Sequence, residues 1–124
     1  MPEYLFVYGT LKRGYPLGAW LEGSKFLRLG QIAGMKMYDL GPFPCVVPQE
    51  LGETSSRNFG QRILGEIFEV SQETLDLLDE VESEMFDRVY YLTTLGMRVN
   101  VYIWHDDKLP AGATVIEGGV WRKK

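Results

Sequence analysis

Carboxylates with no basic residue among them fill the stretch from residue 73 to residue 87. Asp and Glu side chains are among the groups that carry out general acid and base catalysis when they are suitably placed. A solvated helix face is the alternative interpretation, and it accounts for most of these side chains. The seven acidic residues are Glu73, Asp76, Asp79, Glu80, Glu82, Glu84 and Asp87.

Helical spacing separates two of these carboxylates, Glu82 and Glu80. At about 100° per residue, Leu75, Leu78 and Val81 predict the buried face of a helix. Glu82 follows Leu75 by seven residues and Leu78 by four, so its side chain is expected to project between them. Glu80 is expected to point toward water.

A carboxylate on the core side of a helix must be paired, hydrogen-bonded or protonated. Burial raises its pKa toward neutrality, which is the condition that a general acid or base requires. Glu82 is therefore the candidate catalytic residue, although a buried carboxylate with a purely structural role has the same pattern. Asp79 lies at the edge of the apolar stripe.

A second candidate element is the segment Tyr8, Gly9, Thr10 and Leu11, which follows a short aromatic and β-branched run. A strand that ends in Gly-Thr exposes successive backbone N–H groups in a tight turn, and such groups bind carboxylates or oxyanions. An ordinary strand end has the same composition. The segment therefore predicts an anion-binding loop only in combination with other signals.

Other reactive side chains are few. The sequence has no GxxxxGK[ST], GxGxxG or CxxC motif, so phosphate-loop, dinucleotide and zinc-ribbon sites are not predicted. The single histidine, His105, stands in a polar turn, where a solvated side chain is expected. The single cysteine, Cys45, is expected to be a small buried thiol. We expect no metal site.

Length and composition limit the class of protein. The 124 residues suit a single domain spanning 1–124, and the net charge of −4 argues against binding to nucleic acid. No apolar run approaches the roughly 20 residues of a membrane helix, and no signal peptide is recognised at the start. One cysteine cannot form an internal disulfide, so a cytoplasmic protein is expected.

Strands dominate the predicted elements. The main predicted helix begins after Ser71, a suitable N-cap, and runs to about Glu82. A short helix is also predicted over 19–26, a rigid proline-containing loop over 41–44 and an exposed loop over 48–60. An order of strands around one main helix favours an α+β fold with a curved or closed sheet. The predicted strands are 4–8, bent strands within 28–38, 63–70 with Gly65 as a bulge or close backbone approach, 89–94 and 97–104.

Five segments in order, together with Arg88, resemble the γ-glutamylcyclotransferase-like family, which includes γ-glutamylamine cyclotransferase and the AIG2-like proteins. The first is similar to the family's N-terminal YGTLK signature and the fourth to its LDxxE motif. The others are similar to its glycine and proline segment, its GELYEV strand and its closing Gly-x-x-Trp. In chain order the segments are 6–14, 38–44, 65–70, 78–82 and 118–121.

The resemblance implies a small mixed β-barrel flanked by helices. It also implies that Glu82 is the catalytic acid and base, and that Tyr8, Gly9, Thr10 and Leu11 form the substrate-binding loop, with the Tyr8 hydroxyl as a possible further donor. Two residues depart from the family pattern. Ser83 stands where the family usually has Gly, and Phe86 where Tyr is common. These differences concern substrate choice more than activity.

The implied reaction needs no cofactor. The α-amine of a small γ-glutamyl compound attacks its own amide carbonyl, which releases 5-oxoproline and a free amine. A non-catalytic small-molecule binding protein with the same pocket is the alternative, and an interaction protein with a solvated acidic helix is a third. The sequence leaves open the leaving amine, the oligomeric state and the roles of loops 12–25 and 48–60.

Overall fold

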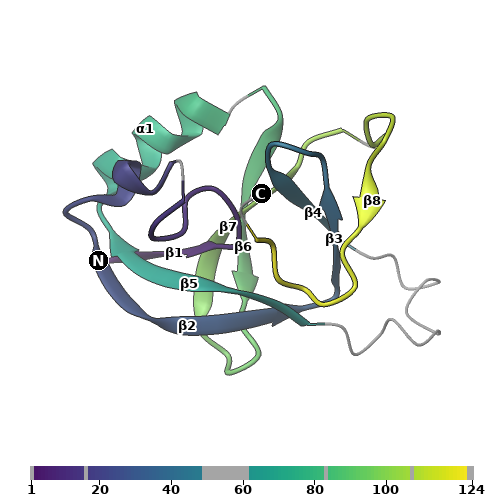
Figure 1. The fold of residues 1–124 in the computed structure, drawn as a ribbon. Coiled ribbons are helices and arrows are strands. Elements are labelled where there is room, and N and C mark those ends of the chain that lie inside the picture. The colour runs from purple at the N-terminus through teal and green to yellow at the C-terminus, as the bar shows by residue number, and fades with distance from the viewer. Residues whose placement is uncertain (1, 16, 49–61, 83, 107, 123–124) are drawn as a thin grey trace.

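The computed structural model describes residues 2–15, 17–48, 62–82, 84–106 and 108–122. These residues form two sheets, one α-helix and one turn of 3₁₀-helix (Figure 1). Most of the predicted loop 48–60 and the departure at Ser83 lie outside the described residues. The elements are β1 (Glu3–Val7), η1 (Gly18–Leu21), β2 (Lys25–Ala33), β3 (Met35–Asp39), β4 (Pro44–Pro48), β5 (Arg62–Val70), α1 (Gln72–Glu82), β6 (Phe86–Leu92), β7 (Arg98–Trp104) and β8 (Thr114–Val115).

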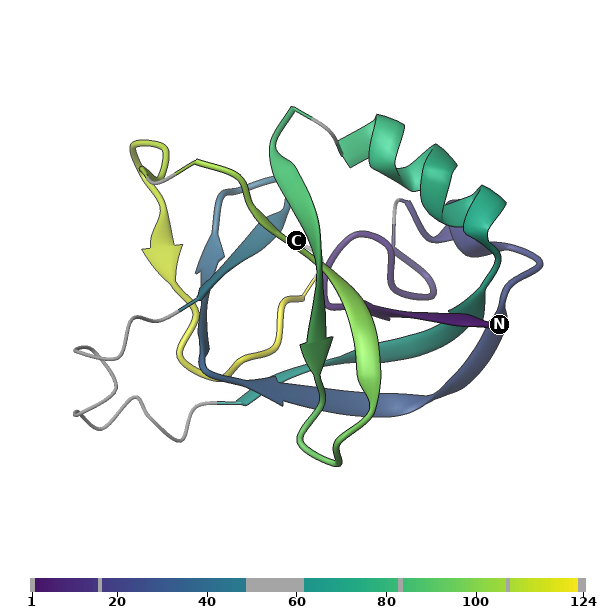
Figure 2. The same cartoon turned by 180° about the vertical axis from the view of Figure 1, so that it is seen from behind.

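The larger sheet has five strands in the order β2-β5-β1-β7-β6. It is mixed, because β1 and β7 are parallel whereas the other neighbours are antiparallel. The sheet curls until the β6–β7 turn lies beside β2 (Figure 2), where the Thr94 amide donates to the Gln31 carbonyl at 2.9 Å. The Tyr91 hydroxyl donates to the Ala33 carbonyl at the same seam.

No strand ladder joins β2 to β6 in the described part of the chain. The α+β class and the mixed sheet are thus confirmed, but the expected barrel is a strongly curved, open sheet. The three-stranded sheet β4-β3-β8 packs beside it (Figure 1). The chain enters that sheet from β2 through Gly34, whose φ of +80° is one that L side chains rarely adopt.

The central strand β1 is buried on both faces, which accounts for its unbroken apolar run. Alternate side chains point to opposite faces of a strand. Leu5 and Val7 pack in a cluster with Leu75 and Leu78 of α1. On the other face, Phe6 packs with buried residues from both sheets. One strand therefore ties the helix to the second sheet and leads directly into the loop after Val7.

Gly65 of β5 shows the predicted close backbone approach. A side-chain carbon there would collide with the Val7 carbonyl and with the Phe6 ring. It pairs with Gly30 of β2, where a side-chain carbon would lie 2.6 Å from Ile67 Cδ1. The two glycines let the strands pass tightly over the core: at Gly65 a side-chain carbon is blocked by backbone, and at Gly30 it requires the Ile67 side chain to move.

Helix α1 begins and ends as predicted. The Ser71 hydroxyl accepts from the Thr74 amide at 3.1 Å, which caps the first turn, and Glu73 lies in that turn. Leu75 and Leu78 are fully buried, as predicted. Val81 is not, because 39% of its surface is exposed. The predicted apolar face is therefore buried over the first two turns and opens beside the last one.

Two other predicted boundaries were wrong. The helix predicted over 19–26 is only η1, and the chain turns at Gly23, whose φ is +91°, before β2 begins at Lys25. The strand predicted over 89–94 begins earlier, at Phe86, because that ring is buried and packs edge-on against Trp104 at 5.7 Å. Of the helices in the described segments, none is long and apolar enough to span a membrane.

Candidate active site

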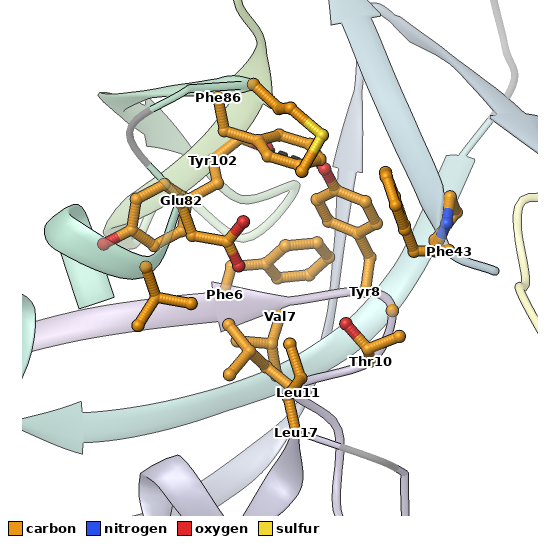
Figure 3. A pocket seen from close by; sticks show the side chains of 14 residues that line it. Phe6, Val7, Tyr8, Thr10, Leu11, Leu17, Phe43, Glu82, Phe86 and Tyr102 are labelled. Carbon is orange, nitrogen blue, oxygen red and sulfur yellow. Dashed lines mark hydrogen bonds between the residues drawn. The ribbon is translucent and has the colours of Figure 1, made fainter. Parts of the chain in front are cut away.

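A pocket of about 210 Å³ opens between the end of α1, the loop after β1 and the start of β6 (Figure 3). Its wall is mostly apolar, and among the described lining residues only Glu82 has a carboxyl side chain. The described lining residues are Phe6, Val7, Tyr8, Gly9, Thr10, Leu11, Leu17, Phe43, Pro44, Val81, Glu82, Met85, Phe86 and Tyr102.

The two elements selected from the sequence meet in this pocket. Glu82 is the last residue of α1, whereas Tyr8 to Leu11 follow β1 at the other end of the sequence. Both come together because Leu75 and Leu78 pack against Leu5 and Val7. The burial of the helix on β1 therefore places the predicted carboxylate opposite the predicted loop.

Glu82 points into the pocket, and its carboxylate lies among aromatic and aliphatic side chains (Figure 3). Burial raises the pKa of this carboxyl group above its ordinary value of 4.5. No salt bridge to the Glu82 carboxylate occurs among the described residues. Glu80 is exposed. The inward and outward directions predicted from helical spacing are thus both observed.

The loop from Gly9 to Lys12 is a tight turn held by its own carbonyl groups. The Lys12 amide donates to the Gly9 carbonyl at 3.0 Å, and the Leu17 amide donates to the Thr10 carbonyl at 2.8 Å. In the described chain, no hydrogen bond from the amide of Thr10 or Leu11 is found. Thr10 and Leu11 both line the pocket, so the predicted anion-binding role of their N–H groups stays a prediction.

Tyr8 contributes to the site in a different way from the one expected. Its hydroxyl donates to the Tyr102 carbonyl at 2.7 Å, so its proton is used within the protein. The side chain is buried, and burial raises its pKa well above 10.0, with further increases from nearby Cys45 and Glu82. Tyr8 therefore anchors the loop and forms part of the wall, and the expected hydroxyl donor is not observed.

Tyr102 is a site residue that the sequence did not identify. Its ring lines the pocket, while its hydroxyl donates to Asp79 Oδ1 at 2.7 Å. The alternation of 97–104 placed it on a face with Asn100, and that polar and aromatic face was the available signal. Its contact with α1 depends on how the helix crosses β7, which no local pattern records.

Asp79 and Arg88 form a two-point ion pair beside the pocket. Arg88 Nε lies 2.8 Å from Asp79 Oδ1, and Nη2 lies 3.0 Å from Oδ2. Burial acts to raise the pKa of Asp79, but hydrogen bonds from Arg88 and Tyr102 and the charge of Arg88 lower it below 3.8. Arg88, which the family pattern singled out, therefore contacts Asp79 and not the pocket.

The basic residues of the loop point away from the pocket. Lys12 is buried, and its Nζ donates to the Trp121 carbonyl at 2.8 Å. The same C-terminal segment is fastened to β5, because the Gly119 carbonyl accepts from the Leu64 amide at 2.9 Å. A side-chain carbon at Gly119 would collide with the Arg62 carbonyl. The hydrogen bond from Lys12 to Trp121 thus joins the N-terminal segment 6–14 to the C-terminal segment 118–121.

Aromatic rings close one side of the pocket. The Phe86 and Phe43 rings lie 6.1 Å apart, and Phe86 is buried against Trp104 on its other side. Phe86 is thus a wall residue of the pocket, so its departure from the family's usual Tyr bears on what the pocket holds.

The other reactive side chains are where the sequence placed them. Cys45 is buried, and burial raises the pKa of its thiol to about 12. His105 is exposed and lies 2.9 Å from Asp87, which raises its pKa above 6.5. In the described segments, no group of three or more His, Cys, Asp or Glu side chains is placed to hold a metal ion.

Comparison with known proteins decides the family. The family model described as "Gamma-glutamyl cyclotransferase, AIG2-like" matches residues 5–123. The chain belongs to this family. Within it, the chain is 36% identical over 91 residues to the γ-glutamylaminecyclotransferase of Bos taurus, which covers 68% of this chain and 52% of that protein. The chain thus spans about half the length of the bovine relative.

Solved structures show the same γ-glutamylcyclotransferase fold. A crystal structure of an uncharacterized protein from Pyrococcus horikoshii has a TM-score of 0.75 at 28% identity, covering 95% of this chain and 88% of that one. The protein c4763 of uropathogenic E. coli has a TM-score of 0.81 at 20% identity, covering 98% and 94%. The second likeness shows the fold alone.

Proposed function

We propose that this protein is a γ-glutamylcyclotransferase that converts a γ-glutamyl amine or γ-glutamyl amino acid to 5-oxoproline and a free amine, without a cofactor. The observation that carries the proposal is the position of Glu82. Its carboxylate is half-buried in an apolar pocket, has a raised pKa and faces the loop with the Thr10 and Leu11 amides. This combination supplies a proton acceptor beside a site for an anion.

The main chemical task of the protein in this reaction is to move protons from the α-nitrogen of the substrate to its leaving nitrogen. The α-ammonium group of the substrate loses a proton to Glu82, and the resulting amine attacks the γ-amide carbon to close a five-membered ring. The carbon–nitrogen bond to the leaving group then breaks. In total two protons leave the α-nitrogen and two arrive on the leaving nitrogen, so Glu82 acts first as a base and then as an acid.

The loop and the apolar wall have separate tasks in this scheme. The amides of Thr10 and Leu11 hold the substrate carboxylate or the developing oxyanion. The rings of Phe43 and Phe86 restrict water around the reacting carbon, which favours ring closure over hydrolysis. Because the nucleophile belongs to the substrate, the pocket has to bind a folded γ-glutamyl group and little else.

The rim of the pocket indicates the class of leaving amine. Val81 and Met85 flank Glu82 and are 39% and 37% exposed, so apolar surface lies next to the group that protonates the leaving nitrogen. A leaving amine with a carbon chain covers this surface when bound. We therefore expect γ-glutamyl amides of alkyl or aralkyl amines to be better substrates than those of short polar amines.

A panel of γ-glutamyl compounds tests the proposal. The protein is incubated with amides of alkylamines, lysine and α-amino acids, and 5-oxoproline is measured by mass spectrometry against spontaneous cyclisation in buffer. Release from at least one compound is expected. Thermal stabilisation by a compound that is not consumed would instead support the binding protein, with about 2.7 kcal/mol at 100-fold excess over Kd.

A further inference from the structure

We propose that Asp79, Arg88 and Tyr102 are positioning residues that fix the last turn of α1, and with it Glu82, relative to the loop from Tyr8 to Leu11. The proposal rests on the role of Glu82 in the proposed function. None of the three is assigned a chemical step. They form one hydrogen-bonded group beside the pocket, and Tyr102 alone also lines it.

The need for such a group follows from how α1 is packed. Its fully buried apolar side chains, Leu75 and Leu78, belong to the first two turns. In the last turn Val81 is 39% exposed. The turn that carries Glu82 is therefore held only weakly by apolar burial, and helix ends fray when they lack tertiary contacts.

Asp79 supplies the missing attachment. It precedes Glu82 by three residues, so the two side chains lie on neighbouring positions of the same helical face. Its carboxylate accepts two hydrogen bonds from Arg88 of β6, at 2.8 and 3.0 Å, and one from Tyr102 of β7, at 2.7 Å. A two-point contact to a guanidinium group fixes orientation as well as distance.

The group continues onto β1, the strand that leads into the loop. Arg88 Nη1 donates to Asn100 Oδ1 at 2.6 Å. Asn100 is buried, and its Nδ2 donates to the Tyr4 carbonyl at 2.8 Å and to Glu3 Oε1 at 3.0 Å. The helix that carries Glu82 and the strand that carries the loop are thus joined through side chains of the two strands between them.

Tyr102 closes the connection from the opposite direction. Its carbonyl accepts from the Tyr8 hydroxyl at 2.7 Å, and its own hydroxyl donates to Asp79. One residue therefore touches both Tyr8 and the helix, and it also lines the pocket (Figure 3). A shift of Asp79 would move Tyr102, the loop and Glu82 together.

Asp79→Asn is the main variant for the test, because it keeps the size of the side chain and removes its charge. Asp76→Asn is the matched control. Asp76 lies one turn earlier on α1, is exposed, and accepts a hydrogen bond from Gln72 Nε2 of the same helix at 2.9 Å. Arg88→Lys keeps the charge but loses the two-point contact, and it should have an intermediate effect.

Three measurements are made on folded protein. The first determines kcat and KM on the best substrate of the panel. The second is the pH profile of kcat/KM. The third is the pKa of the Glu82 carboxyl group, followed by ¹³C NMR of glutamate-labelled protein and assigned by its absence in Glu82→Gln. The other titratable groups that line the pocket are Tyr8 and Tyr102, whose pKa values are both raised by burial, so neither titrates near Glu82.

We expect kcat of Asp79→Asn to fall by roughly 10- to 100-fold with little change in KM, as when a catalytic group is displaced by about 1 Å. A displaced last turn of α1 should expose Glu82 to water, which lowers its pKa toward 4.5. The acid limb of the pH profile of kcat/KM should therefore move to lower pH. Asp76→Asn should match the parent in all three measurements.

The proposal is overturned if Asp79→Asn loses only thermal stability while kcat, the pH profile and the Glu82 pKa stay at parental values. It is also overturned if Asp76→Asn has the same effect as Asp79→Asn. Failure of the proposed function looks different, because no panel compound would be turned over by the parent. The NMR titration still decides the positioning role in that case, since it requires no turnover.

Discussion

Two carboxylates on one face of α1, three residues apart, lie in opposite surroundings. Asp79 accepts hydrogen bonds from Arg88 and Tyr102, and its pKa is lowered. Glu82 lies in a mostly apolar pocket, and its pKa is raised. The chemical group is the same, so the difference comes entirely from the neighbours that the strands bring to each position.

The comparison separates a carboxylate that holds structure from one that is available for chemistry. A charge that is fully paired at neutral pH cannot easily accept a proton, whereas an unpaired, half-buried carboxylate can accept and return one. Sequence position does not make this distinction, since both residues belong to the same acidic run. Substitutions in and around the pocket test whether this difference between Asp79 and Glu82 decides their function.

The largest effect is expected for Glu82→Gln, which keeps the size of the side chain and removes the proton acceptor. Turnover of the best γ-glutamyl substrate should fall by roughly 100-fold or more, the usual contribution of a positioned acid or base. Steady-state kinetics with melting temperature as the folding control measures it. Glu80→Gln is the matched variant and should keep near-parental turnover, because Glu80 is exposed.

Two results would contradict the comparison. If Glu80→Gln is inactive and Glu82→Gln is active, the inward face of the helix carries no catalytic group. If both variants are active, α1 does not supply the acid and base, and the binding-protein alternative gains support.

Gly9→Val should disturb the pocket and leave the Asp79 group intact. A side-chain carbon at Gly9 would lie 2.7 Å from Pro44 Cγ and 2.8 Å from Cδ, so the loop must move. We expect affinity for 5-oxoproline to fall by about tenfold or more, equivalent to roughly 1.4 kcal/mol. Calorimetry on folded protein measures it, and Thr10→Ser is the mild control. Parental affinity in Gly9→Val would rule out binding by this loop.

The raised pKa of Glu82 has a smaller effect, on stability. The folded state binds this proton more tightly than the unfolded state, so Glu82 lowers the free energy of unfolding as pH rises above about 4.5. Glu82→Gln should therefore melt above the parent at about pH 7, with the difference disappearing near pH 4. Calorimetric scans across this pH range measure it. If Glu82→Gln instead melts below the parent at about pH 7, with that deficit disappearing toward acid pH, the pKa of Glu82 is lowered, like that of Asp79.

No effect at all is expected from removal of metal ions. The proposed reaction activates no water, and its proton transfers use Glu82 alone. The measurement is turnover after exhaustive chelation and desalting, with each of several divalent ions added back. Activity that is lost and then restored by one ion would mean that a metal, and not an unpaired carboxylate, drives the chemistry.

Much of this arrangement was accessible from the sequence where local geometry decides it. The spacing of Leu75 and Leu78 gave the inward direction of Glu82, because a helix has one period whatever it packs against. Ser71 marked the start of the helix through its capping hydroxyl. The aromatic run before Gly9 gave a buried strand, which is β1.

The errors arose where distant contacts decide the outcome. Val81 follows the apolar spacing but borders a pocket, and a pattern of hydrophobic residues cannot distinguish a filled core from a cavity. The Tyr8 hydroxyl was expected to serve the substrate, but it is bound by the carbonyl of Tyr102. Closure of the sheet likewise depends on how strongly five strands curl, which no single segment encodes.

The hydrogen bonds that hold the loop after β1 also bear on the order of folding. Tyr8 is joined to Tyr102 across 94 positions of the chain, and Lys12 to Trp121 across 109. Contacts between such distant segments form slowly, because loop-closure entropy is lost before the contact compensates for it. During synthesis the loop emerges early, whereas Tyr102 and Trp121, whose carbonyl groups accept its long-range hydrogen bonds, leave the ribosome much later. A nascent chain therefore carries these loop residues long before the contacts that fix them in the pocket wall can form.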